Sequence, residues 1–337
     1  MDASLPVTDA TAWIGLDISK DTIDACLLRS VGKPQHKVFG NDEHAHQKLL
    51  RWAQQLAPQQ LFHFALEATG SYGDAIAYFL VEANQRVSVI NPARVKYSGI
   101  ASGQTNKTDK ASAEVIANYC RMHQPPLWRM ATPEARLLRA LVRRLEDVAG
   151  LLHQEKNRAA APGLLTAVRQ SLAESQQFLE TQMQSLQKQI DEHIDNTPSL
   201  KEDQELLESI PAVGRLTAQR FLAELPDVSQ FASAQQVAAW AGLSPQENRS
   251  GTSVHKRTRL SKAGNQQLRK AFYLPAVCAT RHNPLVRALY ERMTAAGKSR
   301  MAGVGAAIRK LLMLCYGVLK NRQKFAADWK KPTEAVA

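Results

Sequence analysis

Strand-like alternation of apolar and polar residues occurs only before residue 91 of this 337-residue chain. Segments 13–18 and 22–28 alternate in this way around a short polar stretch, which predicts a β-hairpin. Further strands are expected at 36–39, 61–66 and 86–90, and helices at 43–56 and 72–83. The chain is therefore predicted to begin with a mixed α/β domain, which we place at residues 10–125.

Pro125 and Pro126 end this pattern, and the chain beyond them is expected to be mainly α-helical. Apolar residues recur at spacings of three and four over 137–152, as in an amphipathic helix. Near-heptad spacing over 165–190 indicates either a coiled coil or a helical hairpin within one chain. We place a helical linker with this coiled coil at 133–198, a second helical domain at 203–325 and a flexible tail at 326–337.

The charge balance favours a polyanionic partner. The chain has 43 Lys and Arg against 31 Asp and Glu, a net charge of +12. The segment from 247 to 282 has eight basic residues and one acid, so it carries +7 of that charge, as phosphate neutralisation requires. Its basic residues expected to contact nucleic acid are Arg249, Lys256, Arg257, Arg259, Lys262, Arg269 and Lys270.

Other classes of protein are disfavoured by the sequence. Its four cysteines lie far apart without a Cys-x-x-Cys pair, so neither a disulfide framework nor a zinc knuckle is indicated. No secretory signal is visible, and Arg309 and Lys310 interrupt the longest apolar stretch near the C-terminus, which argues against a membrane span. We expect a cytoplasmic protein without a membrane partner.

Three acidic residues stand where a metal site is expected. Asp17 closes the first predicted strand, Glu67 closes the fourth, and Asp109 opens a helix. Convergent carboxylates are suitable ligands for Mg²⁺, and two such ions can stabilise the attacking and leaving oxygens in phosphoryl transfer. Taken singly, each acid is more often a helix cap or a solvated side chain, and it is their ordered appearance in these elements that favours a metal site.

Two further segments suggest contacts with DNA. Residues 205–218 are predicted to form a helix, a glycine turn and a second helix, as in a helix-hairpin-helix. Such a motif would bind backbone phosphates through Gly214, Arg215 and Thr217. A plain helical hairpin is the alternative. Ser250 lies in an expected flexible loop, 249–253, where arginines could activate its hydroxyl. From spacing alone a turn residue is the favoured explanation of Ser250, and spacing does not distinguish it from Ser244, Ser253 or Ser261.

An ordered set of motifs resembles the DEDD transposases of bacterial insertion sequences, which have a RuvC-like N-terminal domain of RNase H fold. The resemblance spans nearly the whole chain. Its motifs are Gly15-Leu16-Asp17-Ile18-Ser19-Lys20, Leu66-Glu67-Ala68-Thr69-Gly70, Asn91-Pro92, Lys107-Thr108-Asp109, Ser209-Ile210-Pro211-Ala212-Val213-Gly214, Ala241-Gly242-Leu243-Ser244-Pro245, Ser250-Gly251 and Ser261-Lys262-Ala263-Gly264-Asn265.

This resemblance implies a bacterial, nucleoid-associated recombinase that cuts and rejoins donor and target DNA under the guidance of a structured noncoding bridge RNA. It implies a homo-oligomer, dimer or tetramer, with composite active sites. Asp17, Glu67 and Asp109 would hold Mg²⁺ or Mn²⁺, and Ser250 would be the nucleophile.

The chain departs from the family pattern at one position. The family has a fourth acid three residues after the third, and Ser112 stands there in this chain. A neutral hydroxyl is a weaker metal ligand, so we expect weakened metal binding and reduced catalysis. The alternatives are a Holliday-junction resolvase, a nucleic-acid-binding protein without chemistry, and an actin-like sugar kinase, whose second glycine-rich phosphate loop is not found.

Overall fold

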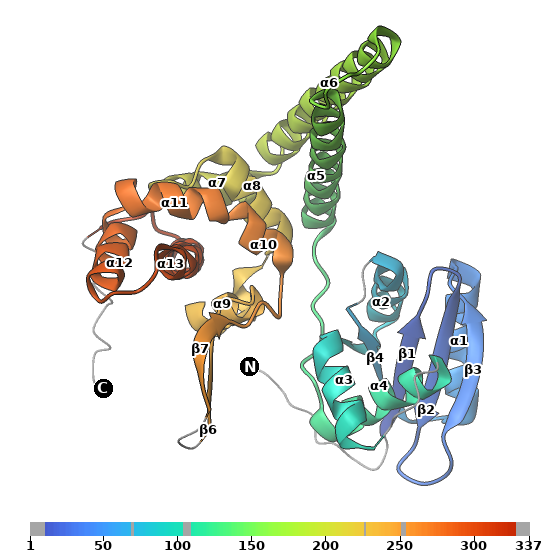
Figure 1. Ribbon diagram of the computed structural model, residues 1–337. Helices are drawn as coiled ribbons and strands as arrows, with labels where there is room; N and C mark the ends of the chain where they lie inside the picture. Colours follow the sequence, from blue (N-terminus) through green and yellow to red (C-terminus); the bar gives the residue numbers. More distant parts are fainter. Residues whose placement is uncertain (1–10, 69–70, 104–108, 226, 251–253, 328–337) are drawn as a thin grey trace. The chain divides into compact units, whose positions relative to one another are not determined.

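A five-stranded mixed sheet forms the centre of the first of two compact units, residues 1–130 and 131–337. The computed structural model describes residues 11–68, 71–103, 109–225, 227–250 and 254–327, with only the backbone of 71, 247–250 and 254–257 (Figure 1). The mixed α/β region followed by a helical region is confirmed. Most of the expected tail, 326–337, lies outside the described residues.

The sheet has the strand order β3-β2-β1-β4-β5. Strands β1, β2 and β3 form an antiparallel meander, and β4 and β5 add in parallel beside β1. This mixed order is consistent with the RNase H-like expectation. The strands are β1 (Thr11–Ile18), β2 (Thr22–Leu28), β3 (Gln35–Gly40), β4 (Leu61–Glu67) and β5 (Arg86–Ile90).

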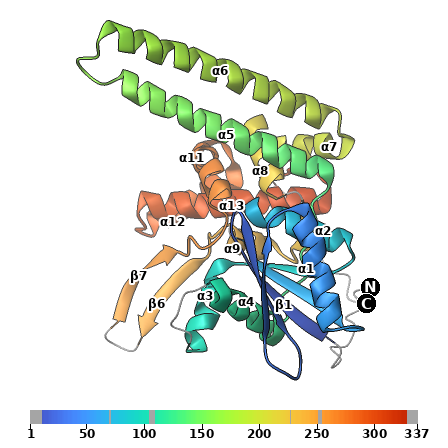
Figure 2. The same cartoon turned by 90° about the vertical axis from the view of Figure 1, so that its right-hand side faces the viewer.

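Helices cover both faces of this sheet (Figure 2). Helices α1 and α2 pack on the face that presents Ile14 and Leu16, whereas α3 and α4 pack on the face that presents Trp13 and Ala65. Alternation along each strand therefore divides the core into two layers. The helices are α1 (Glu43–Leu56), α2 (Asp74–Glu82), preceded by a 3₁₀ turn at Ser71–Gly73, α3 (Pro92–Ala101) and α4 (Asp109–His123).

Helix α4 approaches β1 closely at Gly15. A Cβ at this position would lie 2.1 Å from the carbonyl oxygen of Ala113 and 2.4 Å from the backbone nitrogen of Ala117. Only glycine leaves room for this contact. The strand and the helix are thus held together two residues before Asp17.

A long helical hairpin begins the second unit. Helices α5 (Pro133–Ala159) and α6 (Thr166–Asp195) pack against each other, and Lys156 forms an ion pair with Glu180 at 2.9 Å. The predicted heptad is buried only near the end of α6, at Leu186 and Ile190. The start of α6 stays exposed to solvent, so the hairpin within one chain accounts for only part of the pattern.

The remaining helices of this unit enclose one hydrophobic core. Its central helix, α13, is long and apolar enough to cross a membrane, but more than half of that stretch is buried inside the unit, as in the core helix of a globular protein. The elements are α7 (Pro198–Glu208), α8 (Arg215–Glu224), a 3₁₀ turn (Val228–Gln230), α9 (Ala234–Trp240), α10 (Gln266–Ala271), α11 (Tyr273–His282), α12 (Pro284–Ala295) and α13 (Arg300–Asn321).

An antiparallel β-hairpin interrupts this helical unit, contrary to the prediction of a helical domain with a flexible loop at 249–253. Strands β6 (Pro245–Ser250) and β7 (Val254–Leu260) pair with each other and with no other strand of the described chain. The strands are mostly polar, and the partly buried Leu260 at the end of β7 packs against the core of the unit. The apolar alternation by which strands are recognised is therefore missing from the sequence.

Candidate functional site

Asp17 and Glu67 lie at the ends of two neighbouring parallel strands. The register of β1 and β4 pairs Leu16 with Leu66, so the two acids follow at the same level of the sheet. Ala65 contacts the core formed with α4, and alternation places Glu67 on that same face. The first and fourth strands, which carry these two acids, are thus neighbours in the sheet.

The start of α4 brings two further predicted residues to Asp17. Ser112 donates a side-chain hydrogen bond to the Asp17 carboxylate, and the charge of Asp109 acts on the same group. Ser112 is partly buried and Asp109 is exposed. The structure thus brings Asp17, Asp109 and Ser112 together beside the end of β4 that carries Glu67.

The electrostatics of this cluster favour a positive ligand. Burial, followed by the negative charge of Asp109, raises the pKa of Asp17, and the hydrogen bond from Ser112 offsets this only in part. Burial and Asp109 likewise raise the pKa of Asp24. Carboxylates that repel one another in a partly desolvated site are stabilised by a divalent cation, and oxygen donors of this kind suit Mg²⁺ or Mn²⁺.

Asp24 is an acid that the sequence analysis missed. It pairs directly with Asp17 across the β1–β2 hairpin, so the two side chains share one face of the sheet. The signal was present, because a hairpin with a short polar turn at 19–21 fixes this register. Asp24 gives this chain a nearby carboxylate that position 112 does not supply.

The α7–α8 turn shows the predicted helix, turn and helix. Gly214 is the N-cap of α8, and the exposed Arg215 forms an ion pair with Asp191 at 3.0 Å. Thr217 is buried, and its backbone N–H donates to the Gly214 carbonyl oxygen at 2.9 Å. Gly214 and Arg215 are therefore the predicted residues at this turn that remain accessible for a phosphate.

The basic segment divides into exposed and structural cations. Arg259, Lys262 and Lys270 are exposed. Arg269 instead donates to the carbonyl oxygens of Ala241, at 2.8 Å, and Gly264, at 3.2 Å. Its guanidinium therefore joins the segment before β6 to the segment after β7. The side chains of Arg249, Lys256 and Arg257 lie outside the described part of the structure.

Ser250 is the last residue of β6 and pairs with Val254 of β7, at the far end of the hairpin. Ser244 and Ser261 lie at the opposite end, where the Ser261 N–H donates to the Ser244 carbonyl oxygen at 2.9 Å. Ser253 is outside the described residues. The expected loop at Ser250 is thus a hairpin end, and among the described serines considered for nucleophile Ser250 alone occupies it.

Comparison with known proteins identifies both halves of the chain. A DEDD transposase family of the IS110 type matches residues 14–169, and the transposase IS116/IS110/IS902 family matches residues 204–291. The first match contains Asp17, Glu67 and Asp109, and the second contains the α7–α8 turn and the β6–β7 hairpin.

Similar curated proteins extend over almost the full length. The pilin gene-inverting proteins of Moraxella bovis and Moraxella lacunata are each 31% identical over 93% of this chain and 97% of their own length. An uncharacterized 42 kDa protein of insertion element IS900 from Mycobacterium paratuberculosis is 24% identical over 92% of this chain and 96% of its own. The chain therefore belongs to the IS110 family of DEDD transposases, which are DNA recombinases.

Proposed function

We propose that this transposase cuts and rejoins DNA at the carboxylate cluster, with Ser250 as the nucleophile. The observation that carries the proposal is the convergence of Asp17, Asp109 and Ser112 beside the β4 end that bears Glu67. Asp17, Glu67 and Asp109, assisted by Asp24, would hold Mg²⁺ or Mn²⁺. When bound, such a cation polarises the scissile phosphate and neutralises the charge that develops during transfer.

The position of Ser250 supports its role. It stands at the end of a hairpin whose two strands carry four Lys and Arg against one Glu, so the hairpin can lie along a phosphate backbone. In the proposed step the Ser250 oxygen bonds to phosphorus and one DNA oxygen leaves with the proton. The energy of the cleaved phosphodiester bond is retained in the Ser250–phosphate ester. Attack on that ester by another DNA hydroxyl rejoins the strands and releases the serine.

Binding of DNA and RNA is proposed for the basic surfaces. Arg259, Lys262 and Lys270, with Arg249, Lys256 and Arg257, would neutralise phosphates of donor and target DNA and of a structured guide RNA. The α7–α8 turn would act as a helix-hairpin-helix that binds DNA backbone without reading bases. The names of the Moraxella relatives point to inversion of a DNA segment, which the same cutting and rejoining chemistry would serve.

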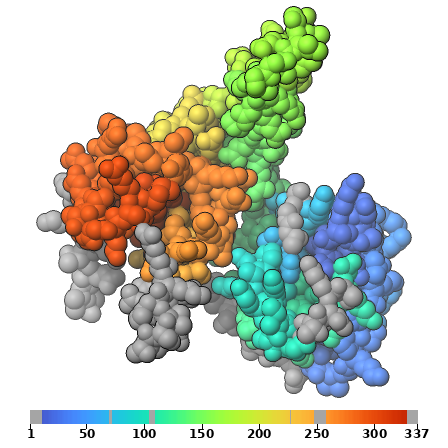
Figure 3. Space-filling view, viewed as in Figure 1, coloured from blue at the N-terminus to red at the C-terminus, as the bar shows by residue number. Residues whose placement is uncertain are grey.

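Assembly is proposed to occur through the α5–α6 hairpin. Leu165, Val168 and Phe178 near its free end are 75%, 44% and 63% exposed, and that end stands clear of the other helices of its unit (Figure 3). Contiguous apolar patches on a protein surface often mark sites of protein–protein contact. A second copy that pairs through the exposed heptad would give the predicted coiled coil and a homo-oligomer with composite active sites.

The decisive experiment seeks a covalent protein–DNA adduct. Purified protein is incubated with Mg²⁺ or Mn²⁺, RNA from the ends of its element and both DNA partners, and the adduct is mapped by mass spectrometry. We expect an adduct at Ser250 that Ser250→Ala abolishes. Ser244→Ala and Ser261→Ala are the matched controls. Both change residues at the base of the hairpin, at the opposite end from Ser250.

Two results would contradict the proposal. Cleavage that continues in Ser250→Ala without an adduct would indicate hydrolysis by water, as in a Holliday-junction resolvase. Absence of cleavage under either metal would indicate a nucleic-acid-binding form weakened by Ser112.

A mixture of Asp17→Asn and Ser250→Ala chains, each inactive alone, should regain activity if the active sites are composite.

A further inference from the structure

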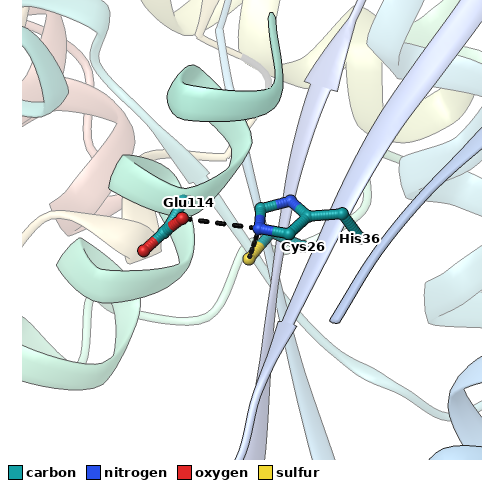
Figure 4. A group of neighbouring side chains, drawn as sticks. All are labelled: Cys26, His36 and Glu114. Carbon is teal, nitrogen blue, oxygen red and sulfur yellow. Dashed lines mark hydrogen bonds and ion pairs between the residues drawn. The ribbon is translucent and has the colours of Figure 1, made fainter. Parts of the chain in front are cut away.

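A second group of ligand-type side chains lies in the first unit, next to the oxygen donors of the carboxylate cluster. Cys26 from β2, His36 from β3 and Glu114 from α4 point toward one another (Figure 4). The Cys26 Sγ is 3.8 Å from the His36 Nε2, and that Nε2 is 3.4 Å from the Glu114 Oε2. The three ligand atoms all lie within 4.8 Å of one another.

The fold fixes this grouping. Cys26 and His36 are direct partners in the β2–β3 register, so their side chains rise from the same face of the sheet. Helix α4 covers that face, since Ala113 and Ala117 pack with Cys26 in one small core cluster. Glu114 is on the adjoining side of the same helical turn, and three rigid elements therefore hold the ligands.

The separations suit coordination of one ion. With Zn–S of about 2.3 Å and Zn–N and Zn–O of about 2.0 to 2.1 Å, tetrahedral geometry places ligand atoms roughly 3.3 to 3.6 Å apart. The observed 3.8 Å and 3.4 Å differ from this by a few tenths of an ångström at most. The third separation, between the Cys26 Sγ and the Glu114 carboxylate, lies within 4.8 Å, so side-chain movements on the order of 1 Å would complete the site.

The ligand types select the ion. A thiolate, an imidazole and a carboxylate together suit a borderline cation such as Zn²⁺, whereas Mg²⁺ and Mn²⁺ prefer sites made only of oxygen. The thiolate and the carboxylate supply two negative charges, which match a divalent cation. Three protein ligands leave a fourth position for water.

We propose that Cys26, His36 and Glu114 form a second metal site, distinct from the carboxylate cluster, which binds a thiophilic divalent cation of the Zn²⁺ class. The ion joins α4 to β2 and β3. Because α4 also carries Asp109 and Ser112, occupation of this site fixes the helix that positions those two residues. The site does not depend on the chemistry proposed for Ser250.

Cobalt is the probe that tests this site. The full chain is stripped with a chelator and titrated with Co²⁺, and a thiolate-to-cobalt charge-transfer band is expected to appear and then to vanish on addition of Zn²⁺. Cys26→Ala should abolish the band. His36→Gln and Glu114→Gln, which change partly exposed side chains, should each weaken Co²⁺ binding at least about tenfold.

Two controls separate this site from other sources of signal. Cys278→Ser removes an exposed cysteine and should leave the band intact. Asp17→Asn alters the carboxylate cluster and should also leave it intact. A wild-type chain without the band, or a band that persists unchanged in His36→Gln and Glu114→Gln, would overturn the proposal and leave only a hydrogen-bonded Cys–His–Glu group, even if Cys26→Ala does not fold.

Discussion

The close contact between β1 and α4 gives a sharp prediction for Gly15→Ala. The added Cβ would lie 2.1 Å and 2.4 Å from backbone atoms of Ala113 and Ala117, so α4 itself must move. Overpacking costs about 1–3 kcal/mol, and the upper value, about 3 kcal/mol, applies because no flexible side chain can give way. At about 4 °C per kcal/mol for a unit of this size, the Tm of the first unit should fall by about 12 °C.

The same movement should impair the carboxylate cluster, because it separates Asp109 and Ser112 from Asp17. A misplacement on the order of 1 Å costs about 100-fold in activity, and we expect a loss of that size in DNA cleavage with Mn²⁺. Calorimetry measures the Tm, and hydrogen exchange of α4 peptides shows where the structure loosens.

Gly99→Ala is the matched control within the same unit. Its Cβ would meet Val115 methyl carbons at 3.4 and 3.6 Å, which is close to ordinary contact, and alanine favours a helix by about 0.5–1 kcal/mol. This variant should keep wild-type activity and Tm or gain slightly in Tm. A Gly15→Ala chain with an unchanged Tm and unchanged exchange in α4 would refute the packing argument.

Three further predictions follow from named contacts. Ser112→Asp adds the missing acid, so it should tighten Mg²⁺ binding in calorimetric titration and raise cleavage, and equal affinity in both chains would contradict this. Because the pKa of Asp17 is raised in the folded state, the folded state without bound metal should lose stability as the pH rises from 3.8 through that raised pKa. With chelator present, Asp17→Asn should lessen this loss. Parallel curves of Tm against pH for the two chains would contradict the prediction. Burial would raise the pKa of Glu224, but hydrogen bonds from Arg143, at 3.1 Å, and Asn265, at 2.6 Å, outweigh burial and lower it. Glu224→Gln should therefore lower the free energy of unfolding in urea by about 1–3 kcal/mol. A change near zero would argue against this network.

Local patterns were sufficient where the chain is both regular and buried. Alternation along the first strands predicted β1 to β5 in order, and the helical spacing after Pro126 predicted a long helix there, because burial of one face imposes those periods. The β6–β7 hairpin escaped this reasoning, since its mostly polar strands lack an alternating apolar face. The heptad of α6 was visible in the sequence, but the exposure of its first half was not.

The sequence by itself determined that Asp17 and Glu67 end their strands and that Asp109 begins a helix, since strand and helix limits depend on neighbouring residues. Only the tertiary structure decided which side chains meet. The register set Asp24 beside Asp17 and His36 beside Cys26, and the packing of α4 at Gly15 delivered Ser112 and Glu114 to them. Residues 7 to 95 positions apart come together there because strand pairing and helix docking, unlike local propensity, act between segments distant in the chain.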